Sequence, residues 1–248
     1  MGYIFSLSRT AELLSNSANS LFDKWRAALR SGLRGHCLLC GTVAERAGLC
    51  GGCVRDLPWL DAAVCRSCAH PLPEPGLCGR CIADPPHYDQ VIAACRYAYP
   101  LDALIQSYKY RGRLAAASTL AALLAGRIRS RPDLIVPMPL AAQRLRERGF
   151  NQALELARII GRQLNAPVDA GLCIKSRDTA PQTRLPWKAR RKNIRGAFVV
   201  LGSLEGCHVA VVDDVLTTGA TLSELARNLK RAGAARVTGY VVARTVSR

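Results

Sequence analysis

The 248-residue sequence has no long apolar run and few acidic or aromatic residues. No stretch approaches the roughly 18–20 consecutive apolar residues that a membrane-spanning helix needs. Residues 1–10 also lack the basic start and the long apolar stretch of a secretory signal. We therefore expect a cytoplasmic protein without a transmembrane segment. Aromatic residues make up only 6% of the chain, so an extended surface for stacking bases is not expected.

Acidic residues are outnumbered, with 18 Asp and Glu against 35 Lys and Arg, which gives a formal net charge of +17. The excess is uneven. Residues 1–90 hold 9 basic and 8 acidic residues, whereas residues 91–248 hold 26 and 10. Such a basic body favours a polyanionic partner, either single-stranded DNA or a ligand rich in phosphate. The alternative is a basic surface that only keeps the protein in solution.

Two common nucleotide-binding patterns are missing around residue 213. The segment has neither the Lys of a Walker loop nor the three spaced glycines of a dinucleotide-binding motif. Instead, the apolar run 209–212 predicts a buried strand. It is followed by two adjacent carboxylates, Asp213 and Asp214, which we expect outside the sheet. A Thr/Gly loop over 217–221 comes next, and the apolar spacing of 222–229 predicts a helix.

A loop between the end of a strand and the start of a helix offers free backbone N–H groups and a positive helix dipole, and therefore binds phosphate well. Gly219 lets the backbone approach a ligand closely. Two carboxylates beside this loop suit vicinal hydroxyls or a magnesium ion. The segment predicts a site for a sugar phosphate. A buried strand followed by an acidic helix cap is the simpler alternative, but it accounts poorly for two acids and a Thr-rich loop.

Eight of the eleven cysteines form four Cys-x-x-Cys pairs, and the pattern of two pairs repeats after 28 residues. Two such pairs chelate one zinc ion in a tetrahedral Cys₄ site. We therefore predict two structural zinc ions. Pairing within each repeat is favoured over interleaved pairing, and disulfides are the alternative that a reducing compartment argues against. The predicted ligands are Cys37, Cys40, Cys50, Cys53, Cys65, Cys68, Cys78 and Cys81.

The chain divides into three predicted parts: an amphipathic N-terminal helix over 1–36, a double zinc ribbon over 37–86 and a larger domain over 87–248. The basic helix could dock on its own protein, on a partner or on a membrane. In the larger domain, predicted strands alternate with predicted helices, which favours an α/β fold with a mostly parallel, doubly wound sheet and helices on both faces. The strands are expected at 91–97, 133–140, 172–175, 197–201, 207–213 and 236–243, and the helices at 101–108, 114–129, 151–164 and 222–229.

The order of these motifs resembles the ComF family, in which a double zinc ribbon precedes a type I phosphoribosyltransferase-like domain. Members are associated with natural DNA uptake and the use of external DNA. The 209–222 segment is similar to the motif of these transferases that binds phosphoribosyl diphosphate (PRPP). The other matching motifs are Tyr108-Lys-Tyr-Arg-Gly-Arg113, Val136-Pro-Met-Pro-Leu140, Arg148-Gly-Phe-Asn-Gln152, Lys175-x-Arg177, Gln182-Thr183, Arg191-x-Asn193 and Gly196-Ala-Phe198.

The resemblance implies a role for each matching residue. Asp213 and Asp214 would hold the ribose hydroxyls of PRPP, and Arg148 would belong to the same site. The 5′-phosphate would lie on Thr217, Thr218, Gly219, Ala220 and Thr221. The diphosphate-binding loop would be Pro137, Met138 and Pro139. The mobile loop would bring Lys175 and Arg177, and the catalytic set would be Lys175, Arg177, Asp213 and Asp214.

Two functions follow as hypotheses. The first is a phosphoribosyltransferase-type protein that binds PRPP or a related ribose 5-phosphate ligand with magnesium and acts in DNA uptake or in the use of external DNA. The second is a non-catalytic module that binds a nucleotide or single-stranded DNA within a complex of DNA-uptake proteins. No motif identifies an acceptor base.

Overall fold

The computed structural model describes residues 35–44, 48–60, 63–110, 115–176 and 194–246. The predicted N-terminal helix therefore lies outside the described residues, apart from Gly35 and His36.

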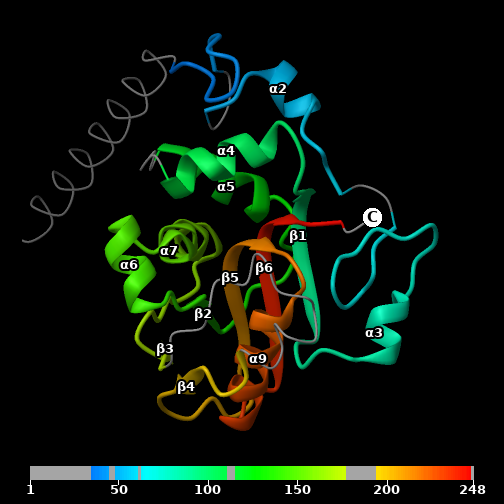
Figure 1. Ribbon diagram of the computed structural model, residues 1–248, viewed down its shortest axis with the longest axis vertical. Coiled ribbons are helices and arrows are strands. Elements are labelled where there is room, and N and C mark those ends of the chain that lie inside the picture. Colours follow the sequence, from blue (N-terminus) through cyan, green and yellow to red (C-terminus); the bar gives the residue numbers. More distant parts are fainter. Residues whose placement is uncertain (1–34, 45–47, 61–62, 111–114, 177–193, 247–248) are drawn as a thin grey trace, which may run out of the picture.

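A four-stranded sheet forms the centre of the molecule, with strand order β1-β6-β5-β2 (Figure 1). All three strand pairs are parallel. The two middle strands are the most apolar and are buried on both faces, as parallel strands covered by helices usually are. The strands are β1 (Gln90–Arg96), β2 (Leu134–Pro137), β5 (His208–Leu216) and β6 (Arg236–Arg244).

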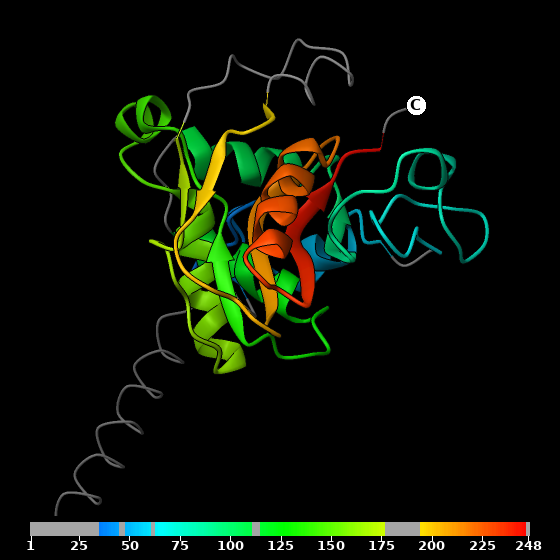
Figure 2. The ribbon, with the colours of Figure 1, turned by 90° about the horizontal axis from the view of Figure 1, so that it is seen from below.

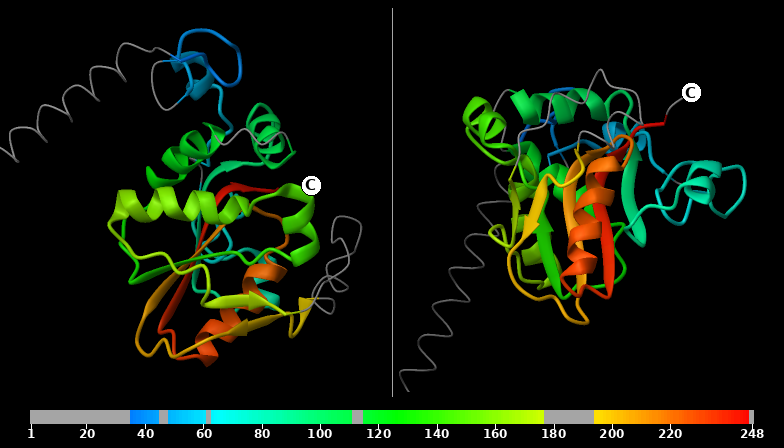
Figure 3. Two further views of the ribbon diagram at one scale, coloured as in Figure 1. Left: turned by 90° about the vertical axis from the view of Figure 1, so that its left-hand side faces the viewer. Right: turned by 60° about the horizontal axis from the view of Figure 1, so that its bottom comes forward.

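Helices cover both faces of this sheet, which confirms the predicted fold class (Figure 3). One buried cluster joins the sheet to α4 (Leu101–Tyr110), α5 (Ala115–Ala125) and α7 (Gln152–Leu164). A second cluster, on the opposite face, joins it to α9 (Ala220–Arg231). Within the described residues no helix has the length and hydropathy that a bilayer crossing requires.

The expectation that strands 172–175 and 197–201 join the main sheet is wrong. They form β3 (Cys173–Lys175) and β4 (Phe198–Val200), an antiparallel pair in a separate two-stranded sheet, and β4 lies beside α9 (Figure 2). Strand-like composition does not specify the partner strand, so the sequence pattern could not separate the two sheets. A further short helix, α6 (Ala142–Arg148), was not predicted, because it buries no residue and so has no apolar face to recognise.

The two cysteine repeats fold into similar knuckles that lie apart on the body of the protein (Figure 1). Each ends in a five-residue helix that directly follows its third cysteine: α2 (Gly51–Arg55) and α3 (Gly79–Ala83). The first knuckle, residues 37–55, joins the buried cluster of α4 and α5. The second knuckle, residues 65–83, joins the cluster of α9 on the other face of the sheet. Each knuckle therefore has its own neighbours in the larger domain.

Candidate functional site

Each knuckle gathers four thiols into one potential metal site. Within each set the sulfur atoms lie within 4.8 Å of one another. The Sγ atoms of Cys40 and Cys50 are 3.6 Å apart, and so are those of Cys68 and Cys78. A tetrahedral zinc ion with Zn–S bonds of about 2.3 Å requires sulfur atoms about 3.8 Å apart. The thiols therefore fit zinc, and the predicted pairing within each repeat is confirmed.

Backbone N–H groups favour the thiolate form, which zinc needs, at the first cysteine of each knuckle. Burial opposes ionisation, yet backbone N–H groups lower the pKa of Cys37 to about 6 and that of Cys65 to about 7. These are the first cysteines of the two repeats, so the same local geometry recurs. The eight cysteines supply two structural sites.

We expect the purified protein to contain two zinc ions per chain, and Cys50→Ser to lose one of them. The first knuckle should then become less stable, because metal binding contributes to its folding free energy. Cys207→Ser is the control, since Cys207 belongs to neither cluster, and it should keep both ions. Elemental analysis with no zinc and these thiols in disulfides would contradict the assignment.

The acid pair lies within the sheet, so the expectation that Asp213 and Asp214 stand outside it is wrong. β5 continues to Leu216, because the long strand β6 pairs with it as far as that residue. On the other side, the last residue of β2 to pair is Pro137, opposite Val212, and the N–H of Met138 then donates to the carbonyl of Val212 at 2.8 Å. The two acids therefore begin where β2 ends.

This point is a switch in the topology of the sheet. The chain leaving β2 forms α7 on one face, whereas the chain leaving β5 forms α9 on the other. Ligands of open α/β sheets bind at such a point, beyond the carboxyl ends of the strands, because the two connections diverge there and leave a crevice. The acid pair lies at this switch point.

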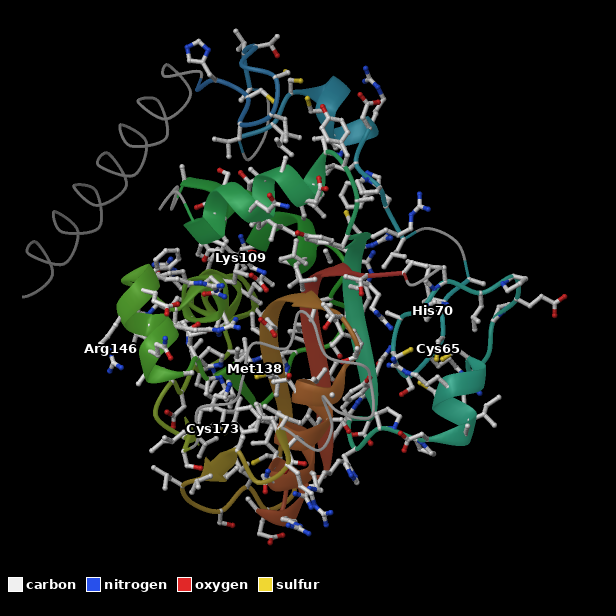
Figure 4. The ribbon with its side chains drawn as sticks, viewed as in Figure 1. Cys65, His70, Lys109, Met138, Arg146 and Cys173 are labelled. Carbon is white, nitrogen blue, oxygen red and sulfur yellow. The ribbon has the colours of Figure 1, made fainter. Side chains whose placement is uncertain are left out.

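The two acids face different surroundings, because successive side chains of a strand alternate between its faces. Asp214 is buried and forms an ion pair with Lys109 of α4, with 2.9 Å between Lys109 Nζ and Asp214 Oδ2. Burial disfavours the ammonium, but the Asp214 carboxylate outweighs it and raises the pKa of Lys109. Figure 4 shows Lys109 on α4. Lys109 is therefore the cation that faces Asp214.

Asp213 is partly buried and accepts a hydrogen bond from the N–H of Asp214 at 2.8 Å. Burial and the charge of Asp214 raise the pKa of Asp213 to about 7, although Lys109 acts in the opposite direction. At neutral pH the pair therefore carries less than two full negative charges. A cation or a hydrogen-bond donor brought by a ligand would complete the ionisation.

The loop after β5 is tightly built. Residues 217–219 join the strand to α9, and Ala220 and Thr221 are the first residues of the helix. Gly219 precedes the helix with φ of +80°, a left-handed conformation that favours glycine. A Cβ at this position would lie 2.7 Å from the Tyr88 hydroxyl oxygen. The loop therefore requires glycine both for its conformation and for its close approach to Tyr88.

Several other predicted residues gather at the same end of the sheet. Met138, which Figure 4 labels, follows β2, and its carbonyl accepts from the side chain of Asn151 at 3.2 Å. Asn151 also caps α7, where its oxygen accepts from two backbone N–H groups. Arg148 ends α6, near enough to Lys109 to affect its pKa. The loop 137–139, Arg148 and the acid pair thus lie at the same end of the sheet.

The structure describes one of the two cations predicted for the mobile loop. Lys175 ends β3, in the separate two-stranded sheet, whereas Arg177 lies outside the described residues. Lys109 was missing from the predicted site, although it belongs to the Tyr108–Arg113 motif that contributed to the family resemblance. Tyr88 carried no recognisable signal, because its role depends on the fold.

A cleft of about 900 Å³ opens between the second knuckle and α9, beside the Thr/Gly loop. Its lining includes Thr218, Gly219 and Ala220 but neither acid of the pair. It is therefore a separate hollow that meets the loop from the side of the knuckle. Its charged side chains are Arg80, Asp84, Arg195, Glu224, Arg227 and Arg231.

The fold and these sites define a type I phosphoribosyltransferase-like protein with two Cys₄ knuckles. Residues 33–82 match the model of the double zinc ribbon domain, and residues 151–248 match that of the phosphoribosyl transferase domain. The DNA utilization protein YhgH of Escherichia coli K12 is 34% identical over 208 residues, which cover 80% of this chain and 91% of that protein. Competence protein F of Haemophilus influenzae is 32% identical over 230 residues, which cover 88% of this chain and 94% of that protein.

Competence protein ComFC of Bacillus subtilis is 34% identical over a shorter stretch of 114 residues, which covers 45% of each chain. The near full-length similarity to the two proteins above shows the family. This chain belongs to the ComF family, as its motifs indicated.

Proposed function

We propose that this chain binds PRPP or a related ribose 5-phosphate ligand, together with magnesium, at the carboxyl end of β5. The observation that carries the proposal is the place of the acid pair. Asp213 and Asp214 begin where β2 ends, at the topological switch of the sheet, and only Val215 and Leu216 separate them from the loop that leads into α9. Carboxylates for hydroxyls and a helix N-terminus for phosphate are thereby adjacent.

In the proposed complex the acid pair accepts from the ribose hydroxyls, and the loop 217–221 receives the 5′-phosphate. The diphosphate lies toward loop 137–139, where Lys109 and Arg148 provide positive charge. Lys175, at the end of β3, and Arg177 would add further positive charge. Magnesium, when bound with the ligand, would neutralise the diphosphate and make it a better leaving group.

The activity that suits this arrangement is phosphoribosyl transfer. A nitrogen nucleophile would attack the anomeric carbon of PRPP, and diphosphate would depart with the electrons of the broken C–O bond. The side chains stabilise the charges that develop in this step. Because relatives are named as DNA utilization and competence proteins, we place the activity in DNA uptake or the use of external DNA.

Binding of Mg-PRPP should release a proton, and this tests the proposal. The ligand needs an ionised Asp213, whose pKa in the free protein is raised to about 7. Affinity should therefore weaken as the pH falls from 8 through 7. At pH 7 calorimetry in buffers of different ionisation enthalpy should show a release of about half a proton per site. Saturable binding without proton release at pH 7 would place the ligand away from Asp213.

The cleft beside the second knuckle supports a second candidate function, the binding of a nucleotide or single-stranded DNA. Four of its lining residues are arginines, against two acids, and Glu224 already forms an ion pair with Arg227. Among the described lining residues there is no Asn, Gln, Phe or Trp, and the rings present are His87 and the buried Tyr88. The lining thus offers few side chains that read or stack bases. The cleft therefore suits phosphate groups, and binding should be independent of base sequence.

Reversing two exposed charges of this cleft, with Arg195→Glu and Arg231→Glu, should weaken binding of a short single-stranded oligonucleotide at least tenfold at low salt. It should also flatten the salt dependence, because fewer counterions are released. The control is Arg131→Glu with Arg162→Glu, which makes the same change in net charge on a different face. Equal losses in both double variants, or none in either, would contradict a site in the cleft.

A further inference from the structure

The second knuckle makes direct contact with the backbone of the Thr/Gly loop through two arginines. Arg80 lies on α3, between Cys78 and Cys81, and its Nη2 donates to the carbonyl of Thr218. Arg244 ends β6, and its Nε donates to the carbonyl of Cys68 at 2.9 Å. The Nη1 of the same guanidinium donates to the carbonyl of Leu216 at 3.2 Å and to that of Thr217.

Arg244 is 4% exposed, and the hydrogen bonds that link its buried guanidinium to the knuckle and the loop all end on carbonyl oxygens. A buried arginine has five donors in a fixed plane, so it holds several carbonyls in a set arrangement. Here one side chain connects Cys68 of the knuckle with Leu216, the last residue of β5, and with Thr217, the first residue of the loop. Displacing Cys68 would therefore disturb the loop directly.

These contacts also orient the peptide groups of the loop. In a trans peptide the N–H points opposite to the preceding C=O. The carbonyls of Leu216, Thr217 and Thr218 point toward the arginines, so the N–H groups of the next residues in the chain point away from them. Positive charge on the carbonyl side also favours an anion near those N–H groups. The arginines therefore preorganise a phosphate-binding backbone.

The described residues of the first knuckle have no comparable position. It joins the cluster of α4 and α5 on the opposite face of the sheet, whereas the second joins the cluster that contains Tyr88 and the start of α9. Tyr88 itself approaches Gly219 from this side. The two repeats thus have the same fold and the same metal ligands but different relations to the proposed ligand site.

We infer that the second zinc knuckle is a positioning element of the ligand site, with Arg80 and Arg244 as its positioning residues, and that the first knuckle is not. This inference rests on the proposed function for its ligand. The metal of the second knuckle would fix Cys68 and α3, and the two arginines would transmit that order to residues 216–218. Loss of the second zinc should then weaken PRPP binding, while loss of the first should not.

The test compares Cys81→Ser with Cys53→Ser, which change the fourth cysteine of each repeat. Each full-length variant should lose one zinc. Calorimetry with Mg-PRPP should show affinity at least tenfold lower for Cys81→Ser and within twofold of the parent for Cys53→Ser. Similar affinities in the two variants would overturn the inference. A parent that does not bind Mg-PRPP would instead refute the proposed function.

A second pair of variants leaves all the metal ligands in place, so a misfolded knuckle cannot decide the result. Arg80→Ala should keep two zinc ions and a parental melting temperature but bind Mg-PRPP at least fivefold more weakly. Without ligand, amide hydrogens of residues 217–220 should also exchange faster. Arg66→Ala removes an exposed arginine from the same knuckle and should change neither quantity. Parental affinity and exchange in Arg80→Ala would overturn the inference whatever the ligand is.

Discussion

Replacing Asp213 and Asp214 together by Asn should abolish binding of Mg-PRPP. Two neutral amides keep some hydrogen-bonding capacity, but they neither balance the charge of magnesium nor accept from both ribose hydroxyls as carboxylates do. The expected result is no measurable calorimetric heat at ligand concentrations that saturate the parent. Zinc content should remain two ions per chain, because neither acid belongs to a cysteine cluster.

The single variants separate binding from folding. Asp214→Asn removes the partner of Lys109 and should lower the free energy of unfolding by about 3 kcal/mol. This is the low end for loss of one member of a buried ion pair, because the Lys109 side chain is still 19% exposed. Asp213→Asn should not destabilise the protein at pH 8, because burial and Asp214 already disfavour its charge. A stable Asp213→Asn protein with lost affinity would support the site. Parental affinity in the double variant would show that the acids are structural.

Gly219→Val should have the second large effect, with loss of ligand binding and of stability together. The residue has φ of +80°, and a Cβ would meet the Tyr88 hydroxyl at 2.7 Å. The conformation alone costs about 1–2 kcal/mol for an L-residue with a side chain, and a β-branched residue is the least tolerant. Calorimetry with Mg-PRPP and thermal unfolding measure the two effects.

Two further variants divide this effect into its causes. Gly206→Ala introduces a side chain at a φ of +73° where nothing lies within 4 Å, so it should lose stability but keep affinity. Combining Gly219→Ala with Tyr88→Phe should recover part of the stability that Gly219→Ala loses, because the clashing hydroxyl is removed. If Gly219→Val binds Mg-PRPP like the parent, the loop does not hold the phosphate.

The sequence predicted well those features that depend on local pattern. The cysteine spacing predicted two metal clusters and favoured pairing within each repeat, because each repeat then holds a complete set of ligands. The structure shows this pairing. The Val-rich run before Asp213 identified a central strand, since strands buried on both faces are continuously apolar. The order of strands and helices then predicted a parallel sheet, which is the one observed.

Features that depend on distant partners were missed. The length of β5 is set by its pairing with β6, so the place of Asp213 inside the sheet was not visible in its own segment. Lys109 pairs with Asp214, although more than 100 residues of sequence separate them. Arg244 and Cys68, which are hydrogen-bonded, are 176 residues apart in the sequence. The local pattern of either segment alone does not predict these contacts. They arise only when the knuckles and α4 fold onto the sheet.

The central claim is that the carboxyl end of β5, at Asp213 and Asp214, binds a phosphoribosyl ligand. Titrating the zinc-loaded parent protein with Mg-PRPP in a calorimeter at pH 8 tests it most directly. We predict one saturable site per chain. Ribose 5-phosphate should compete for it, because it keeps the phosphate and the hydroxyls, but should bind more weakly without the diphosphate. A folded chain with both zinc ions that gives no binding heat with Mg-PRPP, or that binds it without competition from ribose 5-phosphate, would contradict the account.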